Sequence, residues 1–543
     1  MYKLLLCWRY LRTRYIALVC IVSVMLGVAT MVVVNSVMAG FTHEMQVRLN
    51  GMLGDLVLES RSMDGAADAE AAMETIRQTA GDAVVGMSPT VSVPALMYID
   101  VGGQSLTRQI TMVGIDESTY ADVSQFGDYL QHPDNREQLQ FELRDDGYDV
   151  YDHQIEDQSD MKPRQAMADA GWRYRRYKAM LKAQQREQRR RADAARMQAL
   201  AASGVDPQAG FGETGAADSA AVPGGANDDA NPATAFSDPF ATAAGDEQPQ
   251  GRDFDPANET HTGIVVGMGI CSWRGSDGAD QFIALPGDDV RVSFPKASLP
   301  PEAISEFYTV VDFYESKMQE YDASFVFVPL RKLQESRGMI DPTTGIAKFT
   351  SIQIKLAPGV DANQVRDQLQ EAFPSELFLV STWRDKQGPL LAAVQMETAV
   401  LNVLLFMIVA VAGFGILAIF FMIVVEKTRD IGILKSLGAS AGGVMGIFLT
   451  YGVSLGAVGA GVGVAIGLAF THYINEIADL LSQLTGQPVF DPAVYYFYKI
   501  PTIVNPLTVA WIALGAVLIA VAASVLPALR AAKLHPVRAL RYE

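Results

Sequence analysis

The sequence has few of the residue types on which enzyme active sites and metal centres usually depend. Its 543 residues include only three cysteines, Cys7, Cys20 and Cys271, which give no disulfide framework and no pair with the spacing of metal ligands. The six histidines are scattered, and no HExxH pattern places two of them on one helix face. We therefore expect no catalytic residue, no metal site and no cofactor bound by this chain, and an intramembrane protease or transferase is disfavoured.

Charged residues are absent from four long stretches of the chain. Residues 15–39, 398–425, 441–470 and 507–526 contain no Asp, Glu, Lys, Arg or His. A helix of roughly 20 apolar residues crosses the hydrocarbon core of a bilayer, so each stretch can span a membrane. Ion-coupled transporters usually carry ionisable side chains inside the membrane. Their absence argues against ion coupling and favours a machine that moves helices or handles lipid anchors between them.

The charges that are present divide the chain by sign. The net charge is −18, yet bases exceed acids in three short segments, 1–38, 426–440 and 527–543. Basic residues favour the cytoplasmic side of a membrane. This distribution predicts that both termini are cytoplasmic and that the acidic region 43–394 lies on the opposite, extracytoplasmic side.

Residues 426–440, EKTRDIGILKSLGAS, form a short polar turn between the second and third apolar stretches. Ile431, Ile433, Leu434 and Leu437 recur at helical spacing, while the charged side chains point elsewhere. This pattern is typical of a short amphipathic helix on a membrane surface, with polar groups offered to a soluble partner. An ordinary interhelical loop is the alternative.

This turn closely resembles the cytoplasmic coupling segment of FtsX-like ABC transporter permeases, particularly the lipoprotein-releasing, Lol-type branch. The tail PALRAAKLHPVRALRYE at 527–543 and the stretch EYDASFVFVPLRKLQ at 320–334 resemble the same family. In that family the segment docks on a separate ATPase, and this chain has no GxxxxGK[ST] motif with which to bind phosphate itself. ATP and Mg are therefore expected on the partner. The resemblance implies one set of ATPase-coupling residues: Glu426, Lys427, Arg429, Asp430, Ile431, Ile433, Leu434 and Lys435.

Residues 43–394 are expected to form a large extracytoplasmic α+β domain between the first two membrane helices. It resembles the MacB-like periplasmic domain of Lol-type permeases. A strand, a turn and a helix are predicted over 350–373, and residues 381–398 are predicted to lead as a helix into the second span. Alternating apolar residues predict further strands at 56–60, 94–100, 109–116, 263–270, 288–295 and 306–316.

Residues 117–260 depart from the family pattern, and no property of the family is carried over to them. The basic stretch 163–200 has charges nearly all round, which predicts a solvated helix; an anionic lipid or an acidic partner surface is the alternative contact. Nucleic acid is not an expected partner outside the membrane. Residues 201–260 are predicted to be disordered, because they bury too little apolar surface to offset the chain entropy.

Residues 1–42 are expected to combine an amphipathic amino terminus with the first membrane helix, and residues 395–543 to hold the other three. A cleavable signal peptide is the alternative at the amino end, although the apolar run is longer than the roughly 7–15 residues of a signal core. Glycines four residues apart in the third stretch predict close packing of helices in lipid. These glycines are Gly452, Gly456, Gly459, Gly463 and Gly467.

Together with the resemblance, these features predict a permease subunit of an ABC transporter in the cell inner membrane. A dimer of ATPase subunits would move the helices, and a second permease copy or paralogue would complete a cavity. Lipoproteins would then be released to a periplasmic carrier by mechanotransmission, with the lipid anchor near Met38, Phe41, Leu401 and Leu405. Two alternatives are a mechanotransmitter of the same fold, for drug or toxin efflux or for control of a cell-wall hydrolase, and a membrane-anchored scaffold without energy coupling.

Overall fold

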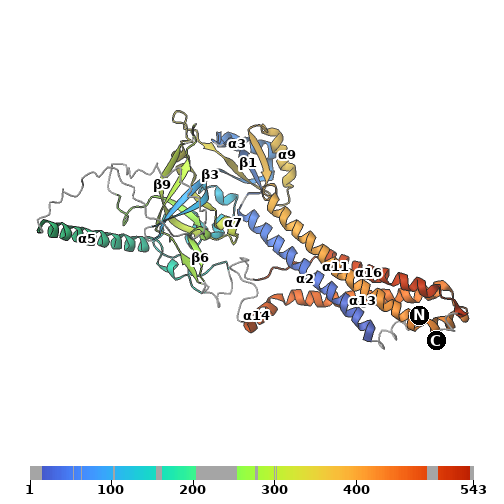
Figure 1. Ribbon diagram of the computed structural model, residues 1–543. Coiled ribbons are helices and arrows are strands. Elements are labelled where there is room, and N and C mark those ends of the chain that lie inside the picture. Colours follow the sequence, from blue (N-terminus) through green and yellow to red (C-terminus); the bar gives the residue numbers. More distant parts are fainter. Residues whose placement is uncertain are drawn as a thin grey trace, which may run out of the picture. The chain divides into compact units, whose positions relative to one another are not determined.

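The chain forms two compact units, one built on long helices and one built on a β-sheet (Figure 1). The helical unit comprises residues 1–50 and 383–543, and the sheet unit comprises residues 51–382. The computed structural model describes residues 15–52, 54–62, 64–101, 104–154, 162–202, 254–275, 279–298, 300, 302–485 and 499–537. The sheet unit is thus inserted between the first long helix and the remaining ones.

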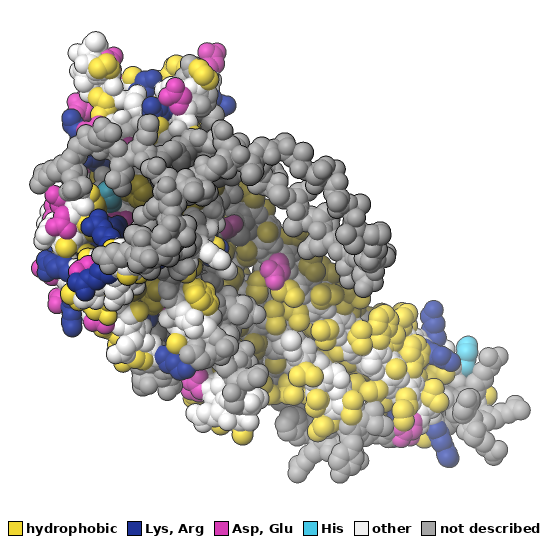
Figure 2. Space-filling view, turned by 60° about the vertical axis from the view of Figure 1, so that its left-hand side comes forward, with side chains coloured by type: hydrophobic (Ala, Val, Ile, Leu, Met, Phe, Trp, Pro, Cys, Tyr) yellow, Lys and Arg dark blue, Asp and Glu magenta, His cyan; other side chains and the backbone are white. Residues whose placement is uncertain are grey.

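Among the described residues, four helices of the helical unit are long and apolar enough to cross a membrane. Each contains most or all of one charge-free stretch, so the prediction of four such helices is confirmed. Hydrophobic side chains cover much of the exposed surface of these helices, as expected for surfaces that face lipid (Figure 2). The four helices are α2 (Tyr15–Met52), α11 (Gly388–Glu426), α13 (Ala441–His472) and α16 (Pro506–Ala532).

Three shorter helices lie next to the long ones in the chain: α10 (Trp383–Lys386) before α11, α12 (Thr428–Ser436) between α11 and α13, and α14 (Ile474–Thr485) after α13. α11 is continuous from Gly388, with a proline in its first turn, where a missing N–H removes no helical hydrogen bond. The expected boundaries after residues 42 and 394 both fall inside long helices, because α2 continues to Met52 and α11 has already begun.

Nine strands of the sheet unit form one sheet in the order β13-β1-β12-β3-β4-β10-β5-β9-β8. All six separately predicted strands are found, although the stretch 263–270 turns after Gly267 into a short helix. The strands are β1 (Leu56–Ser60), β3 (Val84–Val101), β4 (Gln104–Ile115), β5 (Thr262–Gly267), β8 (Asp289–Pro295), β9 (Ala303–Tyr314), β10 (Phe325–Pro329), β12 (Ser351–Leu356) and β13 (Phe378–Thr382).

The long strand β3 closes part of this sheet into a barrel. Its second half pairs with β4 along one edge, while Leu96, Met97 and Tyr98 also pair with β8. The ring therefore runs β3-β4-β10-β5-β9-β8 and back to β3, with parallel pairs β4–β10 and β5–β9 and antiparallel pairs elsewhere. Side chains alternate across each strand, so one set fills the interior, including Val93 and Met97.

The first half of β3 belongs instead to an open sheet with β12, β1 and β13. Helices α3 (Ala69–Ala80) and α9 (Ala362–Ala372) pack with it, and their side chains Ile76 and Leu369 are fully buried with Leu56 and Leu58 of β1. The sheet unit therefore has two hydrophobic cores that share one strand. The predicted strand, turn and helix over 350–373 correspond to β12 and α9.

The stretch 117–260, to which no property of the family was carried over, contributes to the barrel core. Tyr148 and Met167 are buried in it, and the Tyr148 hydroxyl donates to the Val311 carbonyl at 2.6 Å. Helix α5 (Trp172–Ala202) then begins at Trp172 rather than at residue 163. Arg175 anchors its first turn, whereas the side chains at positions 180–195 are all exposed. Most of the stretch predicted to be disordered, residues 203–253, lies outside the described residues.

Shorter elements complete the sheet unit. Two small ribbons pair β2 (Ala66–Ala67) with β11 (Lys348–Phe349) and β6 (Ser272–Arg274) with β7 (Asp280–Phe282). Among its described residues, the remaining α-helices are α4 (Pro133–Glu137), α6 (Met268–Cys271), α7 (Gln319–Asp322) and α8 (Leu330–Arg337).

Candidate functional site

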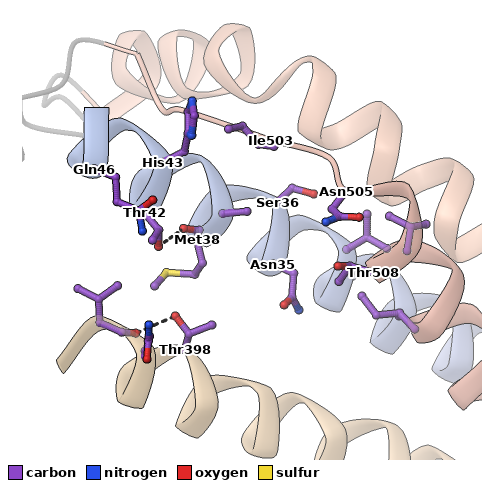
Figure 3. A pocket seen from close by; sticks show the side chains of 16 residues that line it. Asn35, Ser36, Met38, Thr42, His43, Gln46, Thr398, Ile503, Asn505 and Thr508 are labelled. Atoms are coloured by element: carbon purple, nitrogen blue, oxygen red, sulfur yellow. Dashed lines mark hydrogen bonds between the residues drawn. The ribbon is translucent and has the colours of Figure 1, made fainter. Parts of the chain in front are cut away.

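A cavity of about 400 Å³ lies between α2, α11 and α16 in the helical unit (Figure 3). α2 lines it with residues between positions 32 and 46, α11 with residues between 394 and 398, and α16 and the segment before it with residues between 503 and 512. These positions are near the start of α11 and α16. Since α12 follows the end of α11, the cavity and α12 lie at opposite ends of the helical unit.

Both polar and apolar side chains line this cavity. The hydroxyls of Thr42 and Thr398 donate to carbonyls of their own helices at 2.8 Å, so these groups are satisfied without a ligand. Asn35, Gln46 and Gln395 bring amide groups to the wall. Ligand pockets in proteins typically combine apolar walls with a few polar groups that fix orientation. The cavity therefore suits an amphiphilic molecule better than a purely polar one.

The segment before α16 is held closely against α2. The amide of Ile503 donates to the Ser36 carbonyl at 3.0 Å. A Cβ atom at Gly40 would lie 2.3 Å from the Pro501 carbonyl oxygen, so only glycine allows this approach. Asn505 then caps α16 by accepting a hydrogen bond from the Leu507 amide at 3.0 Å. These contacts fix one wall of the cavity relative to α2.

The structure brings only one of the four predicted lipid-anchor residues to the cavity. Met38 lines it, whereas Phe41, Leu401 and Leu405 are not among the lining residues. Leu405 is 8% exposed and packs inside the helical unit. The polar residues of the cavity were not proposed from the sequence, because they come from three segments that are far apart in the chain.

The predicted coupling segment forms the helix α12, with Glu426 at the end of α11. Ile431 is buried in the core of the helical unit, whereas Ile433 and Leu434 are 43% and 46% exposed. Arg429 is exposed, and Lys427 pairs with Asp430 at 2.8 Å within the same turn. α12 thus presents charged and apolar groups together on one surface.

Lys435 occupies a different position from the one expected of a contact residue for a soluble partner. Its ammonium group donates to the carbonyl oxygens of Ala532 and Leu534, both at 2.7 Å. These carbonyls lie at the carboxyl end of α16, where helix carbonyls lack intrahelical partners. Lys435 therefore caps α16, and sequence spacing gave no sign of this contact.

The five predicted packing glycines face two different helices. A Cβ at Gly452 would lie 2.5 Å from the Ser524 hydroxyl oxygen, and one at Gly456 would lie 2.8 Å from the Ala520 methyl carbon, both on α16. The other three glycines face α2, and a Cβ at each would lie 2.7–2.9 Å from an atom of that helix. The nearest residue is Val24 for Gly459, Met25 for Gly463 and Val32 for Gly467. Helix α13 is thus in close backbone contact with α16 along its first half and with α2 along its second half.

Residues 452–456 also spell G-V-S-L-G, the pattern of a hydrolase nucleophile elbow. Such an elbow needs a sharp strand-to-helix turn that exposes the serine. Ser454 instead lies inside α13 and donates to the Thr450 carbonyl at 2.8 Å. The pattern is therefore a consequence of the glycine repeat and forms no nucleophile elbow.

Comparison with known families identifies the class of the helical unit. Residues 402–536 match the family of FtsX-like permease C-terminal domains. This range includes α12 and α13 and nearly all of the apolar parts of α11 and α16. The chain thus carries an FtsX-like permease domain. This confirms the resemblance to FtsX-like permeases that the coupling segment indicated.

Individual relatives are named as transporter components. The chain is 30% identical over 280 residues to the lipoprotein-releasing system transmembrane protein LolC of Xylella fastidiosa strain Temecula1, which covers 52% of this chain and 65% of that protein. It is 25% identical over 221 residues to LolE of Haemophilus influenzae, covering 41% and 52%. It is 27% identical over 203 residues to the macrolide export ATP-binding/permease protein MacB of Bdellovibrio bacteriovorus, covering 36% and 28%. The chain spans less than two thirds of each of these three relatives.

Proposed function

We propose that this chain is the permease subunit of an ABC transporter in the cell inner membrane. A separate ATPase drives it, and it releases lipoproteins from that membrane. The observation that supports this most directly is α12, an exposed helix of mixed charged and apolar character within the matched permease domain. Helices of this kind suit docking on a soluble partner, since interfaces combine apolar anchors with charged contacts. The similarity to proteins named as lipoprotein-releasing supports the choice of substrate.

In this proposal both termini and α12 are cytoplasmic, and the sheet unit is extracytoplasmic. Closure of an ATPase dimer displaces α12, and the long helices carry the displacement to the other membrane face. A lipid anchor enters the helical unit from the membrane and occupies the cavity next to Met38, with its polar part at the amide groups. The sheet unit then passes the lipoprotein to a periplasmic carrier. A second permease copy or paralogue completes the transporter.

Reversal of one charge on α12 tests the proposal. Arg429 is exposed and forms no side-chain hydrogen bond or ion pair among the described residues, so Arg429→Glu should leave the fold intact. In the co-purified complex with its ATPase, we expect stimulation of ATP hydrolysis to fall about tenfold or more, as for interface hot spots. Lys499→Glu is the matched control, because Lys499 is exposed outside α12. Co-purification of no ATPase, or unchanged stimulation in the variant, would favour a scaffold instead.

A further inference from the structure

Lys435 connects α12 to the carboxyl end of α16. Both of its described hydrogen bonds go to carbonyl oxygens at that end, Ala532 and Leu534. A cation at a helix carboxyl terminus is favoured both by the unpaired carbonyls and by the helix dipole. The contact joins segments 97 and 99 residues apart in the sequence, so it is a tertiary link rather than a local turn.

The last turn of α16 is held from more than one side. Ala528 and Ala531 are fully buried in the core of the helical unit, and the Arg530 guanidinium lies 5.8 Å from the centre of the Phe421 ring on α11. Pro527 stands inside the helix and removes one backbone hydrogen bond just before this turn. Tertiary contacts, including that of Lys435, therefore decide how this turn is placed.

The opposite end of the same helix forms a wall of the cavity. Thr508, Val509 and Ile512 line it from α16, and Asn505 caps the helix there. α16 spans 27 residues, which at about 1.5 Å per residue places these two ends roughly 40 Å apart. Close contacts of Gly452 and Gly456 with Ser524 and Ala520 hold the helix between its ends.

We propose that Lys435 is a positioning residue that links α12 to α16, so that a displacement of α12 changes the cavity through α16. This route is additional to the direct covalent path through α11. The inference rests on the proposed function, because the displacement comes from the partner ATPase. The exposed Arg429 surface then contacts the ATPase, while Lys435 passes the movement inward. Arg and Lys both supply donors to two carbonyls, whereas an apolar side chain of similar length supplies none.

The test measures the cavity directly. Thr508→Cys places a thiol on the α16 wall, and its rate of alkylation by N-ethylmaleimide is followed by peptide mass spectrometry. The buried Cys20 and Cys271 serve as internal references of slow reaction. The co-purified complex of full-length chain and ATPase is compared with and without ATP and vanadate. We expect nucleotide to change the rate at position 508, and Lys435→Met to reduce that change about fivefold or more, the lower end of usual coupling between sites.

Three further measurements separate this link from a merely structural role. Lys435→Arg should keep the nucleotide-dependent change. Lys533→Met should keep it as well, because Lys533 is exposed at the same end of α16 and lies outside the coupling segment. ATP hydrolysis should continue in Lys435→Met. If that variant aggregates, Lys435→Leu replaces it, because leucine also lacks a hydrogen-bond donor. A nucleotide-dependent change that persists in the Met or Leu variant, or that is absent with Lys435 intact, overturns the inference. Absence of any ATPase from the complex overturns the proposed function instead.

Discussion

The Lys317 ammonium is paired with the Asp152 carboxylate inside the sheet unit, and both side chains are at most 5% exposed. Lys317 follows the end of β9, and Asp152 belongs to the stretch 117–260. Glu315 also pairs with Lys317 and in turn with Arg164, whose second partner is Asp280 at 2.8 Å. These charges form one buried network that joins this stretch to the barrel.

Removing the cation from this network should be costly. Lys317→Met leaves Asp152 and Glu315 with less compensation in a buried site, and breaking a buried pair in this way typically costs about 3–5 kcal/mol. We expect the free energy of opening of the sheet unit to fall by about that amount. Hydrogen exchange of β9 and β10 amides in the full-length protein measures it, because protected core amides report the opening free energy.

The control for Lys317 is Lys296→Met. Lys296 is 39% exposed and pairs with Glu302 at 3.3 Å, and such surface pairs contribute about 0–1 kcal/mol. If both variants lose the same amount of opening free energy, the buried network stabilises the sheet unit no more than a surface ion pair does.

The sheet unit should lose stability as pH rises from 5 to 7. Burial raises the pKa of Asp322 to about 7, and burial does the same for Asp312. In that range the folded state holds protons that the unfolded carboxyl groups have released, so raising the pH favours unfolding. Glu315 does not reverse this trend: although burial opposes it, the charges of Lys317 and Arg164 hold its pKa at about 2, and its effect lies below this range.

Asp322→Asn tests whether the Asp322 carboxyl group causes part of this pH dependence. Asp322 accepts hydrogen bonds from the Ser316 amide and hydroxyl through one oxygen, both at 2.8 Å, and the asparagine oxygen can keep both bonds. We expect the pH dependence of the opening free energy to decrease by up to about 1.4 kcal/mol per pH unit. Asp367→Asn, at an exposed position, should leave the slope unchanged. A slope that Asp322→Asn does not alter contradicts the prediction.

Local patterns in the sequence predicted the elements but not how they join. Runs without charged residues predicted the four long helices, and alternating apolar residues predicted strands such as β1 and β8. Both patterns can be read within a short stretch of sequence, because they depend only on neighbouring residues. Barrel closure depends on Leu96, Met97 and Tyr98 meeting β8 almost 200 positions later, and no local pattern encodes such a pairing. For the same reason the network of Lys317 and Asp152 was not predicted.

For the candidate site too, the sequence predicted local features but not the contacts between distant segments. The helix α12 and the glycine contacts of α13 follow from spacing along one helix. Lys435 was assigned to the ATPase surface from the resemblance of its segment, whereas its position depends on carbonyl groups at the end of α16, 97 and 99 residues further on. Apolar residues near the ends of the spans were chosen for the lipid anchor, including Phe41, Leu401 and Leu405. Which of them face the cavity depends on how each helix is rotated about its own axis.

Close packing of α13 against α2 can be tested at one glycine. A Cβ at Gly463 would lie 2.7 Å from the Met25 carbonyl oxygen and 2.9 Å from the Val28 Cβ, so Gly463→Val forces the two helices apart. Overpacking of this kind typically costs about 1–3 kcal/mol. We expect a lower thermal midpoint of the helical unit in detergent, measured by circular dichroism of the full-length protein.

Gly461→Val is the matched control on the same helix. A Cβ there meets no atom within 4 Å among the described residues, so the two variants share the change in helix propensity and differ only in contact. Equal effects of the two substitutions would mean that propensity, not interhelical contact, explains the loss.

If a lipid anchor binds in the cavity, a larger side chain that fills the cavity should weaken this binding. Met38→Trp enlarges a lining side chain, and we expect cross-linking to a triacylated lipopeptide with a photoreactive acyl chain to fall about tenfold, which corresponds to about 1.4 kcal/mol. Met396→Trp provides the control, because Met396 is 70% exposed near the same end of α11 and does not line the cavity. If both variants cross-link as the unchanged protein does, the anchor binds elsewhere, and the apolar positions Leu401 and Leu405 become the sites to test.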